Sequence, residues 1–199
     1  MARAARACLQ DNFCGGVVVT KYGHVKGEIA NVACFEGGHP VPDENSLRGK
    51  DAALALTEDL TESDTVVFLL SGGGSALFEK PLLPLAELQD VTNQLLAAGA
   101  DIVEINTIRK RLSAVKGGRF ARHCAPAQVF AVVLSDILGD PLDMIASGPA
   151  YPDSSSCAQA LDIAKRYGLR LSERAWAILA QETPKTLENV ETQITGSVR

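Results

Sequence analysis

The residues best suited to chemistry form a triple-glycine loop after an apolar run at 64–70: Ser71, Gly72, Gly73, Gly74 and Ser75. The run is rich in β-branched and bulky side chains, which predicts a buried strand. Consecutive glycines leave the backbone unshielded, so its N–H groups can approach an anion closely where a helix begins. We therefore expect a phosphate or a carboxylate at this loop. A tight turn that only packs a helix against the strand is the structural alternative.

This loop matches neither of the common nucleotide-binding fingerprints. The P-loop pattern GxxxxGK[ST] occurs nowhere in the sequence. The stretch "SGGGSALFE" lacks the third glycine of GxGxxG, and Asp90 falls inside a predicted helix rather than at the end of a second strand. A dinucleotide-dependent oxidoreductase is therefore disfavoured.

The second cluster is the basic stretch 104–123, which stands out in a chain of formal net charge −5. At helical spacing Arg109 and Lys116 can share a face, although "KGG" at 116–118 interrupts the helix, and Asn106 adds a neutral hydrogen-bonding group. Cations in this arrangement suit a phosphorylated substrate, because Arg and Lys bind phosphate through charge-assisted hydrogen bonds. A solvated basic helix face would show the same composition.

Two further loops carry polar groups at predicted strand ends. His39 lies in the rigid loop 36–46 and could contact a substrate or only cap the backbone. Asp136 ends the buried run 127–136, and Asp140 follows it. Acidic groups at strand ends suit Mg²⁺ or a substrate hydroxyl, whereas Asp140 could equally cap a helix.

Alternating strands and helices must position these loops. Apolar runs predict strands at 15–20, 28–35, 64–70 and 127–135. Helical periodicity predicts helices at 46–60, 84–98, 107–122, 154–167 and 172–182, after an amphipathic N-terminal segment. The alternation is typical of a single α/β domain over residues 1–199, with one mostly parallel sheet and helices on both faces. Ligands bind such sheets at the carboxyl ends of the strands, so the loops 71–76 and 135–140 should share an edge.

Composition excludes several classes of protein. The acidic balance and the absence of Lys/Arg blocks argue against a nucleic-acid partner. No run of 18 apolar residues occurs, so we expect no membrane partner. The 5 cysteines are odd in number, scattered and accompanied by only 3 histidines, which argues against a disulfide framework and a zinc site. A reducing cytoplasm is the simplest interpretation.

Five segments carry a resemblance to a known family: "KYGH", "EGGHPVPDENS", "LLSGGGSAL", "LLAAGADIVEINTIRKRLSAVKGGR" and "LSDILGDPLDMIASGPAYPD". In this order, over nearly the whole chain, they resemble the N-terminal domain of the bacterial-type (class II, MOFRL-family) glycerate 2-kinases, formerly often labelled hydroxypyruvate reductases. The resemblance implies a Rossmann-like α/β domain that faces a second domain across a cleft. It also implies phosphoryl transfer from ATP to the 2-hydroxyl of D-glycerate with Mg²⁺, giving 2-phosphoglycerate. A homodimer is a further expectation.

The resemblance also implies roles for the candidate residues. The glycine loop from Ser71 to Ser75, together with His39, becomes a phosphate or substrate cradle. Asn106, Arg109 and Lys116 become anion contacts, and Asp136 and Asp140 become metal ligands, with Asp136 alternatively a partner of the substrate hydroxyl. The implied catalytic residues are Arg109, Lys116 and Asp136.

The chain also departs from the family pattern. Family members begin with a strand and a glycine-lysine loop that do not occur here, and they continue into a C-terminal MOFRL domain. We therefore expect a truncated kinase whose 199 residues alone show little or no turnover. Two other functions remain open, namely a sugar-phosphate enzyme of the isomerase or lactonase type and a non-catalytic metabolite-binding domain.

Overall fold

Strands form close to the positions that the apolar runs predict. The computed structural model describes residues 1–135, 139 and 141–196. Within them lie the strands β1 (Gly16–Lys21), β2 (Val32–Gly37), β3 (Thr65–Leu70), β4 (Gln128–Leu134) and β5 (Val190–Gly196). All strand pairs in the named sheets are parallel, as the alternation of strands and helices predicts.

The strands β3, β4 and β5 form one sheet in that order, with Leu70 opposite Val133. Because β3 and β4 run in the same direction and in register, the chain leaves both at the same edge. The prediction that the loops 71–76 and 135–140 share an edge is thus confirmed as far as Ser135. Residues 136–138 and 140 lie outside the described residues.

The prediction of a single sheet is wrong. β1 and β2 pair with each other and form a sheet separate from β3, β4 and β5. The helix α2 (Glu44–Leu56) packs closely on this pair, because a Cβ at Gly49 would lie 2.7 Å from Val19 and 3.0 Å from Phe35. Apolar runs indicate that strands are buried, but tertiary packing decides which strands exchange hydrogen bonds.

Most of the helices fall within the predicted segments. Besides α2, the α-helices of the described residues are α1 (Ala2–Leu9), α3 (Gly74–Leu77), α4 (Leu85–Ala97), α5 (Ile102–Arg111), α6 (Arg119–Cys124), α7 (Cys157–Arg166) and α8 (Glu173–Leu179). Two short 3-10 helices, η1 (Gln10–Asn12) and η2 (Ile145–Ser147), accompany them. Capping boxes begin α2 at Asp43, α5 at Asp101 and α7 at Ser156, and they satisfy N–H groups that a first turn leaves unpaired. Among these described helices, none combines the length and the apolar character needed to cross a membrane.

The segment predicted as a helix at 107–122, with an interruption at "KGG", forms two separate helices, and the first of them begins earlier, at Ile102. α5 ends at Arg111 and α6 begins after Gly118, and between them Gly117 and Gly118 have φ angles of 56° and 80°. Glycine adopts this left-handed backbone without strain, and it ends a helix. The turn brings Lys116 back to the glycine loop, where its Nζ lies 2.9 Å from the carbonyl oxygen of Ser75.

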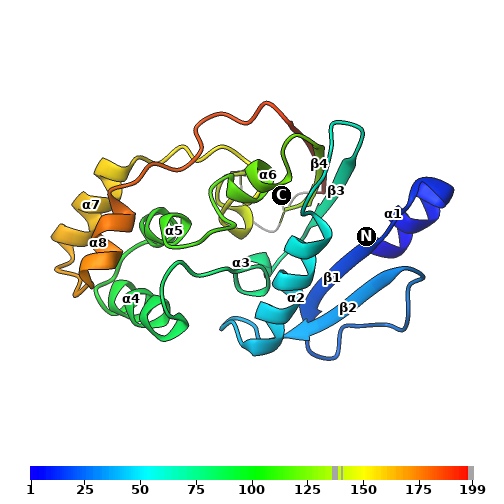
Figure 1. The fold of residues 1–199 in the computed structure, drawn as a ribbon. Helices are drawn as coiled ribbons and strands as arrows, with labels where there is room; N and C mark the ends of the chain where they lie inside the picture. Colours follow the sequence, from blue (N-terminus) through cyan, green and yellow to red (C-terminus); the bar gives the residue numbers. More distant parts are fainter. Residues whose placement is uncertain (136–138, 140, 197–199) are drawn as a thin grey trace.

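Three apolar clusters hold together the elements that Figure 1 draws, and two of them are large. Helices α4, α5, α7 and α8 gather at one end of the molecule around buried residues that include Leu95 and Ile108. In the second cluster the rings of Phe68, Phe78 and Phe120 lie 4.8–5.8 Å apart between their centroids. This aromatic cluster joins β3, the end of α3 and α6, and so fixes the glycine loop against the sheet.

Candidate anion-binding site

The loop after β3 turns at its middle glycine. Gly73 has a φ angle of 87° and directly precedes α3. A Cβ at Gly73 would lie 3.0 Å from Cδ2 and 3.1 Å from Nε2 of His39, so the imidazole lies against the loop backbone. Ser71, Gly72 and His39 are exposed. The structure therefore brings the predicted loop and the predicted histidine together at one accessible edge.

Lys116 lies beneath this loop and is fully buried. Its Nζ donates to three backbone carbonyl oxygens, those of Ser75 (2.9 Å), Phe78 (3.2 Å) and Ala146 (3.3 Å). Burial is the largest cause that lowers the pKa of Lys116, to about 8; the charge of Glu79 opposes the shift and that of Arg109 adds to it. The ammonium thus ties α3 to the η2 segment and supplies positive charge from behind the loop.

Arg109 reaches the surface beside the same loop. Its side chain is 17% exposed, and its guanidinium donates to the carbonyl oxygen of Ser75 at 3.3 Å. Oε2 of Glu79 lies 3.8 Å from the guanidinium of Arg109 and 3.6 Å from Nζ of Lys116. Two cations and one carboxylate therefore lie directly behind Ser75.

A chain of side-chain hydrogen bonds joins the loop to α5. Oγ of Ser147 donates to Oδ1 of Asn106 at 2.9 Å and lies 3.3 Å from Oγ of Ser75. Ser147 and Asn106 are buried, whereas Ser75 is half-buried. Asn106 therefore reaches the loop through Ser147, a residue that the sequence analysis did not single out.

The segment that carries Ser147 has an uncommon backbone. Ala146, Ser147 and Gly148 have φ angles of 50°, 62° and 63° in succession. Non-glycine residues adopt this conformation at a cost and do so mainly where the surrounding structure enforces it. Here Gly117 N–H donates to the Ser147 carbonyl at 3.0 Å and Gly118 N–H to the Gly148 carbonyl at 2.7 Å. The two glycine-containing segments thus hold each other in place beside the site.

The other buried basic residues of the stretch 104–123 are structural. Lys110 and Arg111 are fully buried, so the interpretation as a solvated face is wrong for them. Nζ of Lys110 lies 3.0 Å from Asp143 and 3.1 Å from Asp153, and Arg111 lies 3.5 Å from Asp153. Arg119 donates to backbone carbonyls at the end of α5.

The acidic residues divide into two groups. Asp136 and Asp140, the predicted magnesium ligands, lie outside the described residues. Asp143 accepts hydrogen bonds from Lys110 and from Ser154, so its Oδ2 is already engaged. Within residues 1–135, 139 and 141–196, no group of three His, Cys, Asp or Glu side chains could hold a metal ion.

Sequence reasoning missed Glu79 in this site. The residue interrupts the apolar stretch after the glycine loop, and its side chain has no exposed surface. A charged residue in a buried segment needs a partner, because burial of an isolated charge is costly. This composition signal could have pointed to Glu79 as the counter-charge of the nearby basic stretch.

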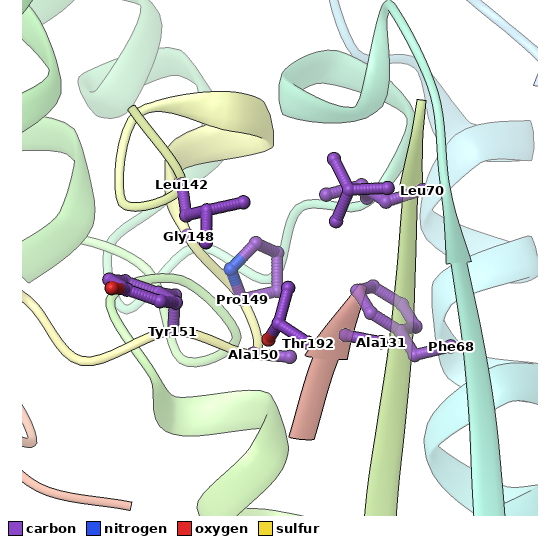
Figure 2. A pocket seen from close by; sticks show the side chains of 10 residues that line it. Phe68, Leu70, Ala131, Leu142, Gly148, Pro149, Ala150, Tyr151 and Thr192 are labelled. Carbon is purple, nitrogen blue, oxygen red and sulfur yellow. The ribbon is translucent and has the colours of Figure 1, made fainter. Parts of the chain in front are cut away.

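A small pocket begins next to the glycine loop, at Leu70, and most of its lining side chains are apolar (Figure 2). It is lined by apolar side chains of the β3–β4–β5 sheet, such as Phe68 and Leu70, and by the segment from Gly148 to Tyr151. Its volume of about 10 Å³ is enough for roughly one water molecule. Among the described residues that line it, none carries a charged side chain, so these residues do not suit an anion.

Comparisons with known proteins give a consistent relationship. A family model described as "Domain of unknown function (DUF4147)" matches residues 1–180. The chain is 54% identical over 201 residues to the D-glycerate 2-kinase of Thermotoga maritima, covering 100% of this chain and 48% of that protein. It is 42% identical over 203 residues to an Agrobacterium vitis protein that bears the name of a hydroxypyruvate reductase, covering 100% of this chain and 45% of that protein.

The fold agrees with a solved structure as well. A crystal structure of glycerate kinase from Thermotoga maritima superposes with a TM-score of 0.95 at 55% identity, over 98% of this chain and 48% of that chain. The chain therefore spans about half the length of the relatives that it matches.

Proposed function

Because the chain belongs to the DUF4147 family, we propose that the protein is a glycerate 2-kinase, which transfers the γ-phosphoryl group of ATP to the 2-hydroxyl of D-glycerate. The observation that supports this most is the convergence at one sheet edge of the glycine loop, Arg109 and Lys116. The similarity to the D-glycerate 2-kinase of Thermotoga maritima supports D-glycerate or ATP as the anionic ligand of this loop.

The proposal assigns roles to the described residues. The backbone from Ser71 to Ser75 and the imidazole of His39 bind an anionic group of the substrate or of ATP. Arg109 stabilises charge on the phosphate or carboxylate, since phosphoryl transfer depends mainly on positioning and on electrostatic stabilisation. Lys116 acts from behind the loop, because its donors are occupied by carbonyl groups.

Mg²⁺ is part of the proposal on the basis of reaction chemistry. When bound, it would neutralise charge on the phosphate oxygens of ATP. Asp136 and Asp140 remain its proposed ligands, because carboxylate oxygens suit Mg²⁺ and both residues follow β4 in the sequence. Asp143 fits this role poorly, since Lys110 and Ser154 already bind its Oδ2.

A reductase is the alternative that the name of the Agrobacterium vitis relative raises. Reduction of hydroxypyruvate needs a nicotinamide cofactor, and the loop does not carry the dinucleotide fingerprint. Isomerase, lactonase and purely binding functions are also compatible with an anion-binding loop.

One set of assays on the full-length protein separates these functions. We expect ADP release that depends on D-glycerate and Mg²⁺, with 2-phosphoglycerate as the product by ³¹P NMR. Arg109→Met should lower kcat/KM at least about tenfold, as expected when a charge-assisted hydrogen bond is lost. Arg122→Met, at an exposed position of α6, is the matched control and should leave kcat/KM unchanged. Oxidation of NADH with hydroxypyruvate, without ADP release from ATP and glycerate, would refute the proposal.

A further inference from the structure

Glu79 has an environment that is unusual for a buried carboxylate. The residue is 1% exposed, yet among the described residues no donor lies within normal hydrogen-bond distance of either carboxylate oxygen. Its two nearest cations, Lys116 and Arg109, stop at 3.6 Å and 3.8 Å, which exceeds hydrogen-bond distance. Nε of Arg109 is also buried without a partner. Unsatisfied charged groups on both sides of one contact need an explanation.

The position of Glu79 is fixed by the backbone. Leu82 N–H donates to the Leu112 carbonyl at 2.8 Å, and Ala114 N–H donates to the Lys80 carbonyl at 2.7 Å. These bonds pin the segment after α3 beside the turn that carries Lys116. Phe78, the preceding residue, packs in the aromatic cluster. The backbone of this segment therefore keeps the carboxylate of Glu79 close to the two cations. The separations of 3.6 Å from Lys116 and 3.8 Å from Arg109 follow from this position of the backbone.

We propose that Glu79 is a positioning residue of the anion site, whose charge holds Arg109 and Lys116 behind Ser75 while leaving donors of Arg109 available to an anionic substrate. A direct bidentate bridge would consume the planar donors of a guanidinium. At 3.8 Å the attraction persists without that loss. In the described part of the chain, the guanidinium makes one hydrogen bond, to the Ser75 carbonyl.

The charge balance of the cluster supports this role. Arg109 and Lys116 are cations in close proximity, and each disfavours the charge of the other. The charge of Glu79 favours the ammonium form of Lys116, whereas burial and Arg109 disfavour it. The recorded charged neighbours of Lys116 are Glu79, which follows α3, and Arg109, on α5; the η2 segment offers it the Ala146 carbonyl. Among the described residues, removal of Glu79 would leave the buried Lys116 and the partly exposed Arg109 without a nearby counter-charge.

The test compares Glu79→Gln and Glu79→Asp in the full-length protein. The identity of the anion rests on the proposed function, so affinity is measured by calorimetry for D-glycerate and, separately, for inorganic phosphate. We expect Glu79→Gln to weaken binding of the anion about tenfold and to raise KM more than it lowers kcat. Glu79→Asp keeps the charge and should retain most of the affinity. Glu182→Gln removes a carboxylate beside Arg111 and Lys185 and serves as the control. This variant should change neither the affinity for the anions nor KM.

The pH profile separates positioning from a merely structural role. In the unmodified protein, affinity for D-glycerate should fall as pH rises through about 8, where Lys116 loses its proton. In Glu79→Gln the fall should occur at lower pH, because the charge that favours the ammonium is gone. Unchanged affinity and an unchanged midpoint in this variant, whatever its melting temperature, would overturn the proposal.

A double variant covers the case in which Glu79→Gln does not fold. Glu79→Gln with Arg109→Met removes one negative and one positive charge, so the cluster keeps its net charge. Removing Arg109 also removes a charge that disfavours the ammonium form of Lys116, which offsets the loss of Glu79 there. If Glu79 acts through these two cations, the double variant should therefore bind phosphate as weakly as Arg109→Met alone. A further tenfold loss would refute the inference. If the protein binds phosphate in this pattern but does not phosphorylate glycerate, the proposed function fails and the role of Glu79 stands.

Discussion

At the residue scale, Gly73 combines a backbone requirement with a position in the site. Its φ angle of 87° suits glycine, and the space where a Cβ would lie is next to the ring of His39. Gly99 has a similar φ angle of 78° but open space around the Cβ position. The two glycines therefore separate the cost of the backbone conformation from the effect on the site.

We predict that Gly73→Ala and Gly99→Ala each lose about 1 kcal/mol of stability, because a left-handed backbone disfavours alanine. Gly73→Ala should in addition displace His39 and weaken D-glycerate binding about tenfold, whereas Gly99→Ala should bind normally. Urea unfolding and calorimetry on the same samples give both quantities. Normal affinity in Gly73→Ala would mean that the loop is only a tight turn.

At the element scale, the contact between α3 and η2 decides the shape of the loop. A Cβ at Gly74 would lie 2.7 Å from the Cβ of Ala146, and Ala146 has a φ angle of 50°. Position 74 therefore has no room for a side chain at this contact, and Ala146 has a left-handed backbone that is uncommon for alanine. The carbonyl of Ala146 also accepts a hydrogen bond from Lys116, so a shift of η2 would reach the buried cation.

We predict that Gly74→Ala loses about 1–3 kcal/mol of stability through overpacking. Adding Ala146→Gly removes the colliding methyl group and allows the left-handed backbone, so the double variant should regain most of that loss. Chemical denaturation of both variants measures the recovery. If the double variant is no more stable than Gly74→Ala, the contact between α3 and η2 is not what limits this position.

At the scale of the whole molecule, a buried ionic network links the helical end to the loops beside the site. Lys110 and Arg111 of α5 meet Asp153, which also accepts a hydrogen bond from Thr183 at 2.7 Å. Burial alone would raise the pKa of Asp153, but the Thr183 hydrogen bond and the charge of Lys110 hold it below its usual value. The network therefore joins segments that are distant in sequence through one carboxylate.

We predict that Asp153→Asn loses about 3 kcal/mol or more of stability at pH 7, because it removes the fully buried carboxylate that Lys110 and Arg111 share. The two buried cations would then keep only Asp143 and Glu182, whose side chains are partly exposed. Asp162→Asn, whose carboxylate pairs with Arg166 at the surface, should lose under about 0.5 kcal/mol. Since the pKa of Asp153 is lower in the folded state, its contribution exists above the ordinary aspartate pKa and is lost as pH falls through the folded value. The stability difference between the unmodified protein and Asp153→Asn should therefore shrink in acid; a difference independent of pH would contradict this.

The sequence by itself determined the α/β class, the parallel strands and the chemical character of the glycine loop. These features depend on local periodicity and on glycine, whose signals are readable within a few residues. It also placed Arg109 and Lys116 near one another and indicated a break at "KGG", where Gly117 and Gly118 have a left-handed backbone.

Only the tertiary structure decided how the strands divide into two sheets and which charges face the loop. Arg109, Lys110 and Arg111 are consecutive basic residues, and nothing in the sequence distinguishes their roles. In the structure, Lys110 and Arg111 are buried against Asp153, whereas Arg109 reaches the surface. Glu79 becomes part of the site only because the segments 80–82 and 112–114 pair. Such roles depend on contacts between distant segments, and the pattern of residues along the chain does not encode them locally.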